Sequence, residues 1–280
     1  MLRALTQPAA LPIDVALARQ HVKQDIDFDD VLLRGYIGAA SNAAESQTER
    51  TLLATRWQLV LDSFPGPSMQ GVPWGKTWTL PGHAIVLPRS PVLAVESIKF
   101  LTMGGVLEAL DPSFYAVDTS GPLVRITPVF GRIWPVPLPQ IGAVQVTFLA
   151  GFATAVDVDL QNSTLLPELW RRLVVGEVVR FSVSGGALPA PLKAGRSYAV
   201  ASVASTGAIG LKDLVSGQNI AFTSAGTGSM YLGQVPDAVV SWMLLRVDSL
   251  YAHRGETSTA NVSALPFADR LLDPWRAVQL

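Results

Sequence analysis

Residues 71–77, Gly-Val-Pro-Trp-Gly-Lys-Thr, have the composition of a phosphate-binding loop, in which backbone amides and a lysine hold nucleotide phosphates. The spacing is one residue short, because Gln70 stands where the first glycine is required. Proline and tryptophan would crowd the amides that must wrap the phosphates, and the next residues indicate a strand instead of the required helix. We therefore expect no nucleotide site here.

No other catalytic constellation emerges from the sequence. The histidines, His21, His83 and His253, stand far apart, and none has a metal-ligating neighbour at close helical spacing. No serine occupies a Gly-x-Ser-x-Gly turn, and the absence of cysteine excludes thiolate catalysis, disulfides and cysteine-bound zinc. The sequence thus predicts a protein that is not an enzyme and that binds neither a metal nor a cofactor.

A cluster of four carboxylates precedes a long apolar-faced segment. The spacing of a calcium loop is missing, because there is no central glycine and no terminal glutamate. Carboxylates before a helix complement the positive end of its dipole. We therefore predict that the cluster helps to start a helix, although a cation site is the alternative; its members are Asp25, Asp27, Asp29 and Asp30.

Three tryptophans, Trp74, Trp78 and Trp134, stand beside glycines and prolines. Such residues could form an aromatic surface for sugars or peptides. More often they close the ends of small β-domains, and we favour that interpretation.

Composition limits the classes of partner. Charged residues make up only 15% of the 280 residues and the net charge is −1, so no global field attracts nucleic acid or an anionic membrane. The long uncharged run at residues 133–156 contains prolines and glycines and alternates like a strand at its centre. It predicts a loop followed by a buried strand, and no membrane span.

The chain divides into zones with different periodicity. Residues 1–56 predict two helices, the first beginning near Ile13 and Asp14 and the second carrying apolar residues from Val31 to Ala44 on one face. Residues 57–156 alternate with a period of two and predict an antiparallel β subdomain. Its expected strands are residues 57–61, 77–80, 84–87, 94–101, 115–118, 123–127 and 144–148.

Residues 157–233 are rich in glycine, serine, alanine and valine and predict an inserted all-β module. A short helix is expected near residues 167–173 at its front end. The expected short strands of the module are residues 176–183, 188–192, 197–200, 220–223 and 229–232.

The chain then returns to a helix at residues 234–254, opened by Pro236, and ends in an apolar-basic tail at residues 255–280. Such a tail docks on its own domain or on a neighbour. The predicted fold is α+β, with a small helical bundle of two N-terminal helices and a C-terminal helix, an antiparallel β subdomain and the inserted module.

The order of these segments resembles that of the head–tail connector (adaptor, or head-completion) proteins of tailed bacteriophages. The resemblance covers about 200 of the 280 residues in collinear order. The inserted module departs from the usual connector pattern and resembles small β-modules of phage tails and baseplates. The segments that carry the resemblance are residues 11–22, 32–37, 57–65, 87–98, 115–118, 125–128, 134–135, 146–152, 235–254 and 265–276.

The resemblance implies a virion protein at the head–tail junction, made in the host cytoplasm, that forms a ring, typically dodecameric, beneath the portal. Such a ring extends the channel through which viral DNA passes without sequence-specific binding, and it also contacts the next connector or tail protein. In this family the C-terminal segment commonly reaches the portal. Carried over to this chain, the candidate portal-docking residues are Leu265, Pro266, Phe267, Leu271, Leu272, Trp275 and Arg276.

Two alternatives stay open. One is a stopper or tail-end connector protein, which the same helices and strands could serve. The other is a carbohydrate- or host-surface-binding β-protein built around the tryptophan-rich zone and the inserted module.

Overall fold

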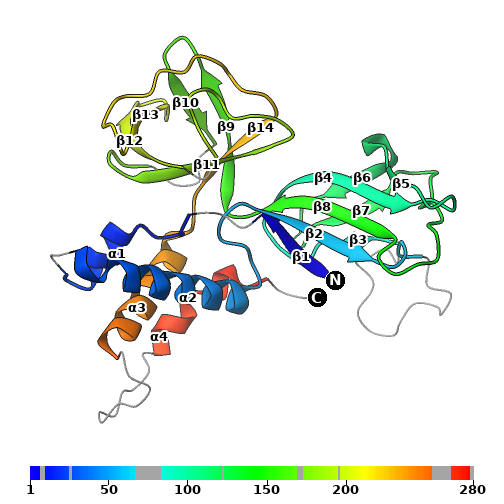
Figure 1. The fold of residues 1–280 in the computed structure, drawn as a ribbon, viewed down its shortest axis with the longest axis horizontal. Helices are drawn as coiled ribbons and strands as arrows, with labels where there is room; N and C mark the ends of the chain where they lie inside the picture. Colours follow the sequence, from blue (N-terminus) through cyan, green and yellow to red (C-terminus); the bar gives the residue numbers. More distant parts are fainter. Residues whose placement is uncertain are drawn as a thin grey trace. The chain divides into compact units, whose positions relative to one another are not determined.

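A computed structural model describes residues 1–6, 10–24, 27–66, 83–121, 123–168, 173–194, 196–253 and 266–277. Its fold is α+β, as predicted, with four α-helices and three antiparallel sheets among these residues (Figure 1). The chain forms two compact units. The sheet unit comprises Met1–Gln7, Thr55–Gly151 and Ala277–Leu280, and the second unit comprises Pro8–Ala54 and Phe152–Arg276.

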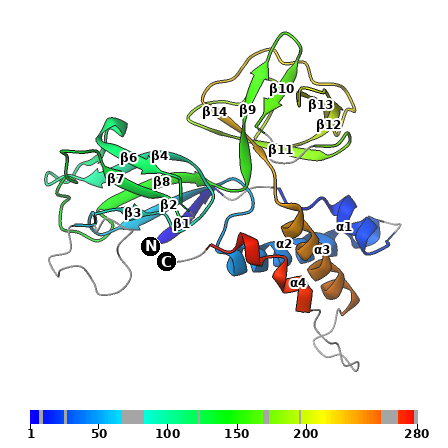
Figure 2. The same cartoon turned by 180° about the vertical axis from the view of Figure 1, so that it is seen from behind.

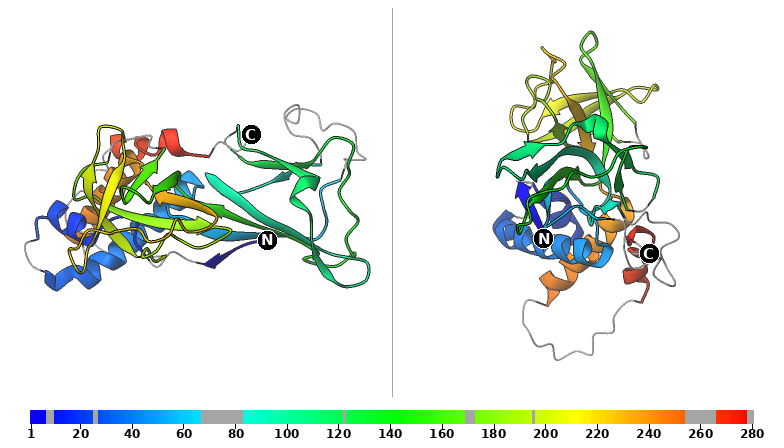
Figure 3. Two further views of the ribbon diagram at one scale, coloured as in Figure 1. Left: turned by 90° about the horizontal axis from the view of Figure 1, so that it is seen from above. Right: turned by 90° about the vertical axis from the view of Figure 1, so that its right-hand side faces the viewer.

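The sheet unit contains a five-stranded sheet in the order β1-β2-β8-β4-β5 and a three-stranded sheet in the order β3-β7-β6. Strands β4 and β8 pair along most of their lengths (Figure 3). A short 3-10 helix, Pro112–Phe114, precedes β6. The strands are β1 (Leu2–Thr6), β2 (Thr55–Leu61), β3 (Ile85–Val86), β4 (Val92–Leu101), β5 (Leu107–Ala109), β6 (Tyr115–Asp118), β7 (Arg125–Pro128) and β8 (Val144–Ala150).

Most of these strands confirm the period-two prediction, because alternate residues must reach a common core. Val144, Val146 and Phe148 are fully buried along β8, which confirms a buried strand in the uncharged run. Two strands, β1 and β5, were not predicted from the sequence. The expected strand at residues 77–80 lies outside the described residues.

The second unit contains a helical core and a closed barrel. The core helices are α1 (Val15–His21), α2 (Asp30–Thr48), α3 (Asp237–Ala252) and α4 (Pro266–Arg270), with 3-10 turns at Asp27–Asp29 and Asp273–Trp275. Figure 2 shows α3 packed along α2, with α4 beside α3. None of the described helices combines the length and hydropathy needed to cross a membrane.

Local signals explain where these helices begin. The Asp14 side chain accepts a hydrogen bond from the Ala16 amide at 3.1 Å and so caps α1. Pro236 stands at the N-cap of α3, where a missing amide proton costs nothing. On α2 the residues Leu33, Ile37, Ala40 and Ala44 recur at helical spacing and are fully buried. The three helices predicted from periodicity are confirmed.

The barrel closes in the order β10-β13-β12-β11-β14-β9, so that no strand is left with an unpaired edge. It encloses its own apolar core, which includes Leu165, Val200 and Leu232. Its strands are β9 (Ala153–Asp159), β10 (Thr164–Pro167), β11 (Val178–Ser184), β12 (Ser197–Val203), β13 (Ile209–Asp213) and β14 (Ser229–Gly233).

The barrel differs in detail from the sequence-based expectation. Its first strand begins at Ala153, directly after the last strand of the sheet unit. Residues 188–192 and 220–223, expected as strands, are turns and irregular chain, whereas β13 was not predicted. In the region expected to be helical, Pro167 ends β10, and residues 169–172 lie outside the described part of the chain.

The two ends of the barrel meet where it joins the helical core. Ala153 pairs with Gly233, and the Gln234 amide donates to the Phe152 carbonyl oxygen at 2.9 Å. Adjacent ends are what allow a complete module to be inserted between two segments of another domain.

Candidate docking segment

The structure places the C-terminal segment against the helical core of its own unit. Leu272 is fully buried there, and Leu271 and Trp275 pack on the same core as half-buried side chains. Phe267 is 57% exposed, and Arg276 is also exposed. Of the remaining candidates, Pro266 begins α4, and Leu265 lies outside the described residues.

Specific polar contacts fix the end of this segment. Arg50 Nε donates to the Trp275 carbonyl oxygen at 2.6 Å. The Trp275 ring meets the Phe152 ring edge-on at a centroid distance of 5.5 Å, and the Arg50 guanidinium lies over the same Phe152 ring at 5.9 Å. Burial lowers the pKa of Arg50. A partly desolvated guanidinium bonded to a carbonyl oxygen holds that end of the segment in one place.

A second contact fixes its beginning, where Trp242 Nε1 of α3 donates to the Asp269 carboxylate at 3.2 Å. The segment therefore has two faces. The inward face, with Leu271, Leu272 and Trp275, completes the helical core. On the outward face Phe267 and Arg276 are exposed.

Sequence reasoning missed the residues that hold this segment, namely Arg50, Phe152, Trp242 and Asp269. Arg50 is more than 220 positions from Trp275, and no periodicity links them. The only usable signal was the apolar character of the tail, which predicted docking but did not distinguish between its own domain and a neighbour.

The acidic cluster takes part in tertiary contacts. Arg19 pairs with Asp30 at 2.8 Å, and Asp29 accepts a hydrogen bond from the Tyr251 hydroxyl at 2.6 Å. Asp29 stands at the N-cap of α2 but makes no side-chain capping bond, so side-chain capping was the wrong expectation for this residue. Asp30, in the first turn, still complements the dipole. Among the described residues no group of three or more potential ligands could hold a metal ion.

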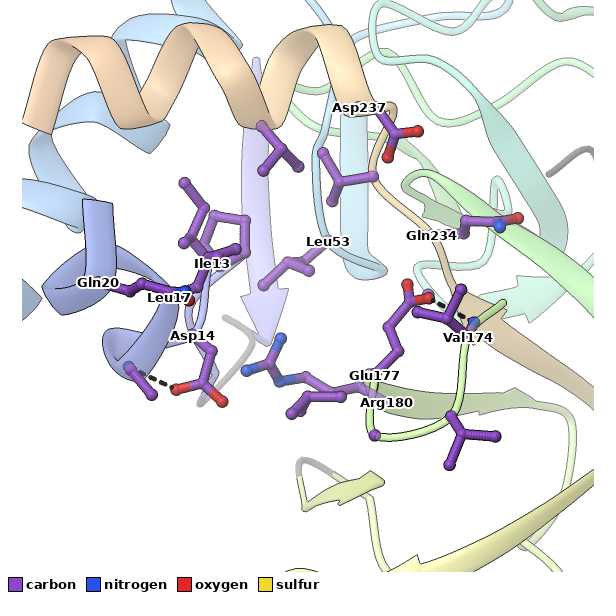
Figure 4. Close-up of a pocket in the computed structure, with 18 residues that line it drawn as sticks. Ile13, Asp14, Leu17, Gln20, Leu53, Val174, Glu177, Arg180, Gln234 and Asp237 are labelled. Carbon is purple, nitrogen blue, oxygen red and sulfur yellow. Dashed lines mark hydrogen bonds between the residues drawn. The ribbon is translucent and has the colours of Figure 1, made fainter. Parts of the chain in front are cut away.

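A cavity of about 690 Å³ lies within the second unit, between α1, the start of α3 and the turn before β11 (Figure 4). Its walls are mainly apolar and include Leu17, Val174 and Val175. Arg180 extends from β11 toward Asp14, and burial lowers the pKa of Arg180 while the Asp14 charge opposes that shift.

Two polar side chains of the cavity, those of Arg180 and Glu177, are engaged within the chain. Arg180 Nε donates to Ser197 Oγ at 2.9 Å, and the Glu177 carboxylate accepts from the Val174 amide at 3.2 Å. Among the described residues that line the cavity there is no serine, threonine, lysine, histidine or tyrosine. The cavity is a mainly apolar cleft with Asp14 and Arg180 on its walls.

The remaining sequence candidates are the three histidines and the tryptophans. The His83 carbonyl oxygen accepts from Trp134 Nε1 at 2.6 Å, while His253 Nδ1 lies 3.1 Å from the Ser249 carbonyl oxygen at the end of α3. His21 ends α1. Trp134 is buried and stacks on Phe64 at 4.8 Å, as expected for a residue that closes the end of a β-domain. The glycine-rich segment 71–77, with Trp74 and Trp78, lies outside the described residues.

Comparison with known proteins defines the fold. No protein-family model and no curated protein matches this chain. Solved structures do match, and in each of three the alignment covers 100% of this chain and 97% of the other chain. They are "Neck of empty GTA particle computed with C6 symmetry" (TM-score 0.57, 17% identity), "Virion of native gene transfer agent (GTA) particle" (0.55, 17%) and "Neck of native GTA particle computed with C12 symmetry" (0.51, 18%).

The likeness establishes a fold that this chain shares with chains of gene transfer agent particles. It extends over the whole chain, so the barrel at residues 153–233 belongs to the shared fold. At 17–18% identity the likeness is one of fold.

Proposed function

We propose that this chain is a structural protein of the neck of a phage-like particle and that it works as part of a ring. The observation that carries the proposal is the full-length likeness to chains in gene transfer agent necks, two of whose structures were computed with C6 or C12 symmetry. In a cyclic assembly, one heterologous contact repeated by rotation closes a ring.

Within that class, we place the chain as the adaptor between portal and tail, in a dodecameric ring that extends the DNA channel. The net charge of −1 is compatible with a channel along which DNA slides without being held. In this proposal the protein is neither an enzyme nor a cofactor carrier. It is made in the host cytoplasm and then resides in the virion, where it contacts the portal, the next connector or tail protein, and passing DNA.

The proposed domains have separate tasks. In this proposal the four described helices form the helical part of the connector core, the sheet unit forms its β subdomain, the barrel at residues 153–233 is a module for peripheral contacts, and residues 255–280 are the docking tail. The contacts of the C-terminal segment divide the docking residues into two groups. Leu271, Leu272 and Trp275 hold the segment on its own core, so portal contact falls to the outward face with Phe267 and Arg276.

The Phe267→Asp variant tests whether the outward face binds the portal. The new carboxylate would be buried without a partner in the complex, and binding would therefore weaken. We expect at least a roughly tenfold loss of affinity for the portal protein encoded with this chain. Phe28→Asp is the matched control, because Phe28 is also exposed and belongs to the same unit. Binding would be measured by light scattering coupled to size exclusion.

Retention of portal binding by Phe267→Asp, or an equal loss with Phe28→Asp, would contradict the assigned docking face. Binding of the unmodified protein to the tail tube in place of the portal would favour the stopper alternative. The carbohydrate alternative is weakened by the burial of Trp134, and a glycan-dependent shift of tryptophan fluorescence would restore it.

A further inference from the structure

Six large apolar side chains are exposed in two loops of the sheet unit. One loop is the turn between β4 and β5, and the other is the connection between β7 and β8 (Figure 1). Their side chains are between 65% and 107% exposed. This loop-end patch consists of Met103, Val106, Phe130, Ile133, Val136 and Ile141.

The two loops meet at the same end of the five-stranded sheet. The Leu138 amide donates to the Leu101 carbonyl oxygen at 2.8 Å, and the Leu101 amide donates to the Ala143 carbonyl oxygen at 2.8 Å. These bonds join the end of β4 to the residues just before β8. The apolar side chains close in sequence to these bonds therefore lie beyond the same strand ends; they are Met103, Val106, Val136 and Ile141.

Internal contacts hold the longer loop in place. Trp134 stacks on Phe64, and its indole nitrogen donates to the His83 carbonyl oxygen at 2.6 Å. Arg132 lies over the Phe114 ring at 4.9 Å. A loop anchored at Arg132, Trp134 and Leu138 presents the side chains between its anchors in one arrangement, which lowers the entropy cost of binding.

The size and charge of the patch identify the kind of contact. Six such side chains expose on the order of 700 Å² of apolar surface, above the largest patch of a typical monomer and close to what one partner buries in a stable interface, about 800 Å². The two loops, residues 102–106 and 129–143, contain one charged side chain, Arg132, which lies over the Phe114 ring. Permanent interfaces between copies of one chain are more apolar than transient interfaces between different proteins.

We propose that the loop-end patch docks on a second copy of this chain and forms one side of the repeated contact in the ring. Pro135, Pro137 and Pro139 remove amide protons from the loop, so the contact is made by side chains and not by an added β-strand. This inference rests on the proposed ring, and it adds the surface through which neighbouring copies recognise each other.

The absence of cysteine allows a direct test. Val136→Cys places one thiol in the patch of the full-length protein, where maleimide-benzophenone can be attached and activated by light. The sample is irradiated alone and after mixing with the portal protein. Cross-linked peptides in which both members come from this chain, in a product of twice the chain mass, are the expected result. Cross-links to other polypeptides only, or no product in either sample, would overturn the proposal.

A variant series measures the contribution of the patch to self-association. Phe130→Ser combined with Ile133→Ser should weaken concentration-dependent association, or portal-induced ring formation, at least tenfold. Val215→Ser, at an 85% exposed valine in a barrel turn, is the matched control and should change neither. Equal behaviour of the patch variant and the control would count against the proposal. Because portal binding is read separately through Phe267, failure of the portal assignment and failure of this contact are distinguishable.

Discussion

The barrel and the helical core of the second unit both bury an apolar interior, but they are built from the chain in opposite ways. The barrel uses one continuous stretch, residues 153–233, and closes on itself. The helical core collects residues from four separate stretches, residues 11–53, Phe152, residues 235–251 and residues 271–275. A region made of one stretch can be removed as a whole, whereas a region made of four depends on each of them.

This difference changes how the C-terminal segment is interpreted. The tail was expected to dock either on its own domain or on a neighbour, and the family resemblance assigned it to the portal. The contacts of Leu272 and Trp275 make it the fourth part of the helical core. Deleting residues 261–280 would therefore remove core residues together with the candidate portal face. If such a truncated protein failed to join portal-bearing capsids, the failure could come from a damaged core or from the lost portal contact.

The largest effect is expected from Leu272→Ala. A fully buried leucine in the helical core loses its transfer free energy and leaves a cavity, so the free energy of unfolding of that core should fall by about 2–5 kcal/mol. Phe267→Ala is the control and should cost less than about 1 kcal/mol, because Phe267 is more than half exposed. Hydrogen exchange resolved by segment would report the loss in α2 and α3, with barrel protection unchanged. Equal loss of protection in the barrel would show that the two regions unfold together.

A smaller effect is expected from excising residues 153–233 and joining Phe152 to the following chain through a short glycine-serine linker. The ends already meet through the hydrogen bond from Gln234 to Phe152, so the helical core should change in stability by no more than about 1 kcal/mol. Circular dichroism and thermal unfolding of the excised protein measure this. The isolated barrel should in turn show its own unfolding transition. Loss of ring formation by the excised protein would make the barrel a structural part of the ring.

The smallest effect concerns pH. Hydrogen bonds from Asn162 lower the pKa of Asp159, and the Val215 amide together with Arg196 lowers the pKa of Asp213. A carboxylate whose pKa is lower in the folded than in the unfolded chain stabilises the fold while it is ionised. This stability is complete above the pKa of the unfolded chain and is lost as the pH falls below about 4. The protection factors of the barrel amides, which compare observed with intrinsic exchange rates at the same pH, should therefore fall on acidification. Asp159→Asn with Asp213→Asn should reduce this response and leave that of the helical core unchanged; an unaltered barrel response would contradict the assignment.

Much of the fold could be predicted from local patterns. The helices at Val15–His21, Asp30–Thr48 and Asp237–Ala252 follow from apolar spacing and from starts at Asp14, Asp30 and Pro236. The strands at Val92–Leu101 and Val144–Ala150 follow from alternation between turn residues. These signals act within one or two turns of chain, and a single sequence contains them.

Other elements depend on distant partners and left little trace in the sequence. Strand β1, Leu2–Thr6, exists because it pairs with β2, more than 50 positions away. Strand β5 is three residues long and pairs only with the end of β4. Residues 220–223 have strand-like composition, yet Ile220 and Phe222 serve as barrel core without joining a ladder. A hydrophobic run shows that burial is needed but does not show how the backbone is paired.

The candidate site shows the same division. An apolar-basic tail was identifiable as a docking element, and its residues could be named. Which of them face inward depends on Arg50, Phe152 and Trp242, whose positions around the tail arise only when the separate stretches pack. The exposed patch on the two sheet loops was not identifiable either, because exposure is a property of the folded surface.

The sequence by itself determined the α+β class, the main helices and strands, the all-β character of the inserted module and the absence of cysteine chemistry, because composition, capping and periodicity are local. Only the tertiary structure decided that the barrel closes, that Leu272 is core while Phe267 is surface, and that Asp29 and Asp30 bind Tyr251 and Arg19. These choices depend on which distant groups can be desolvated together, and that is settled when the chain packs.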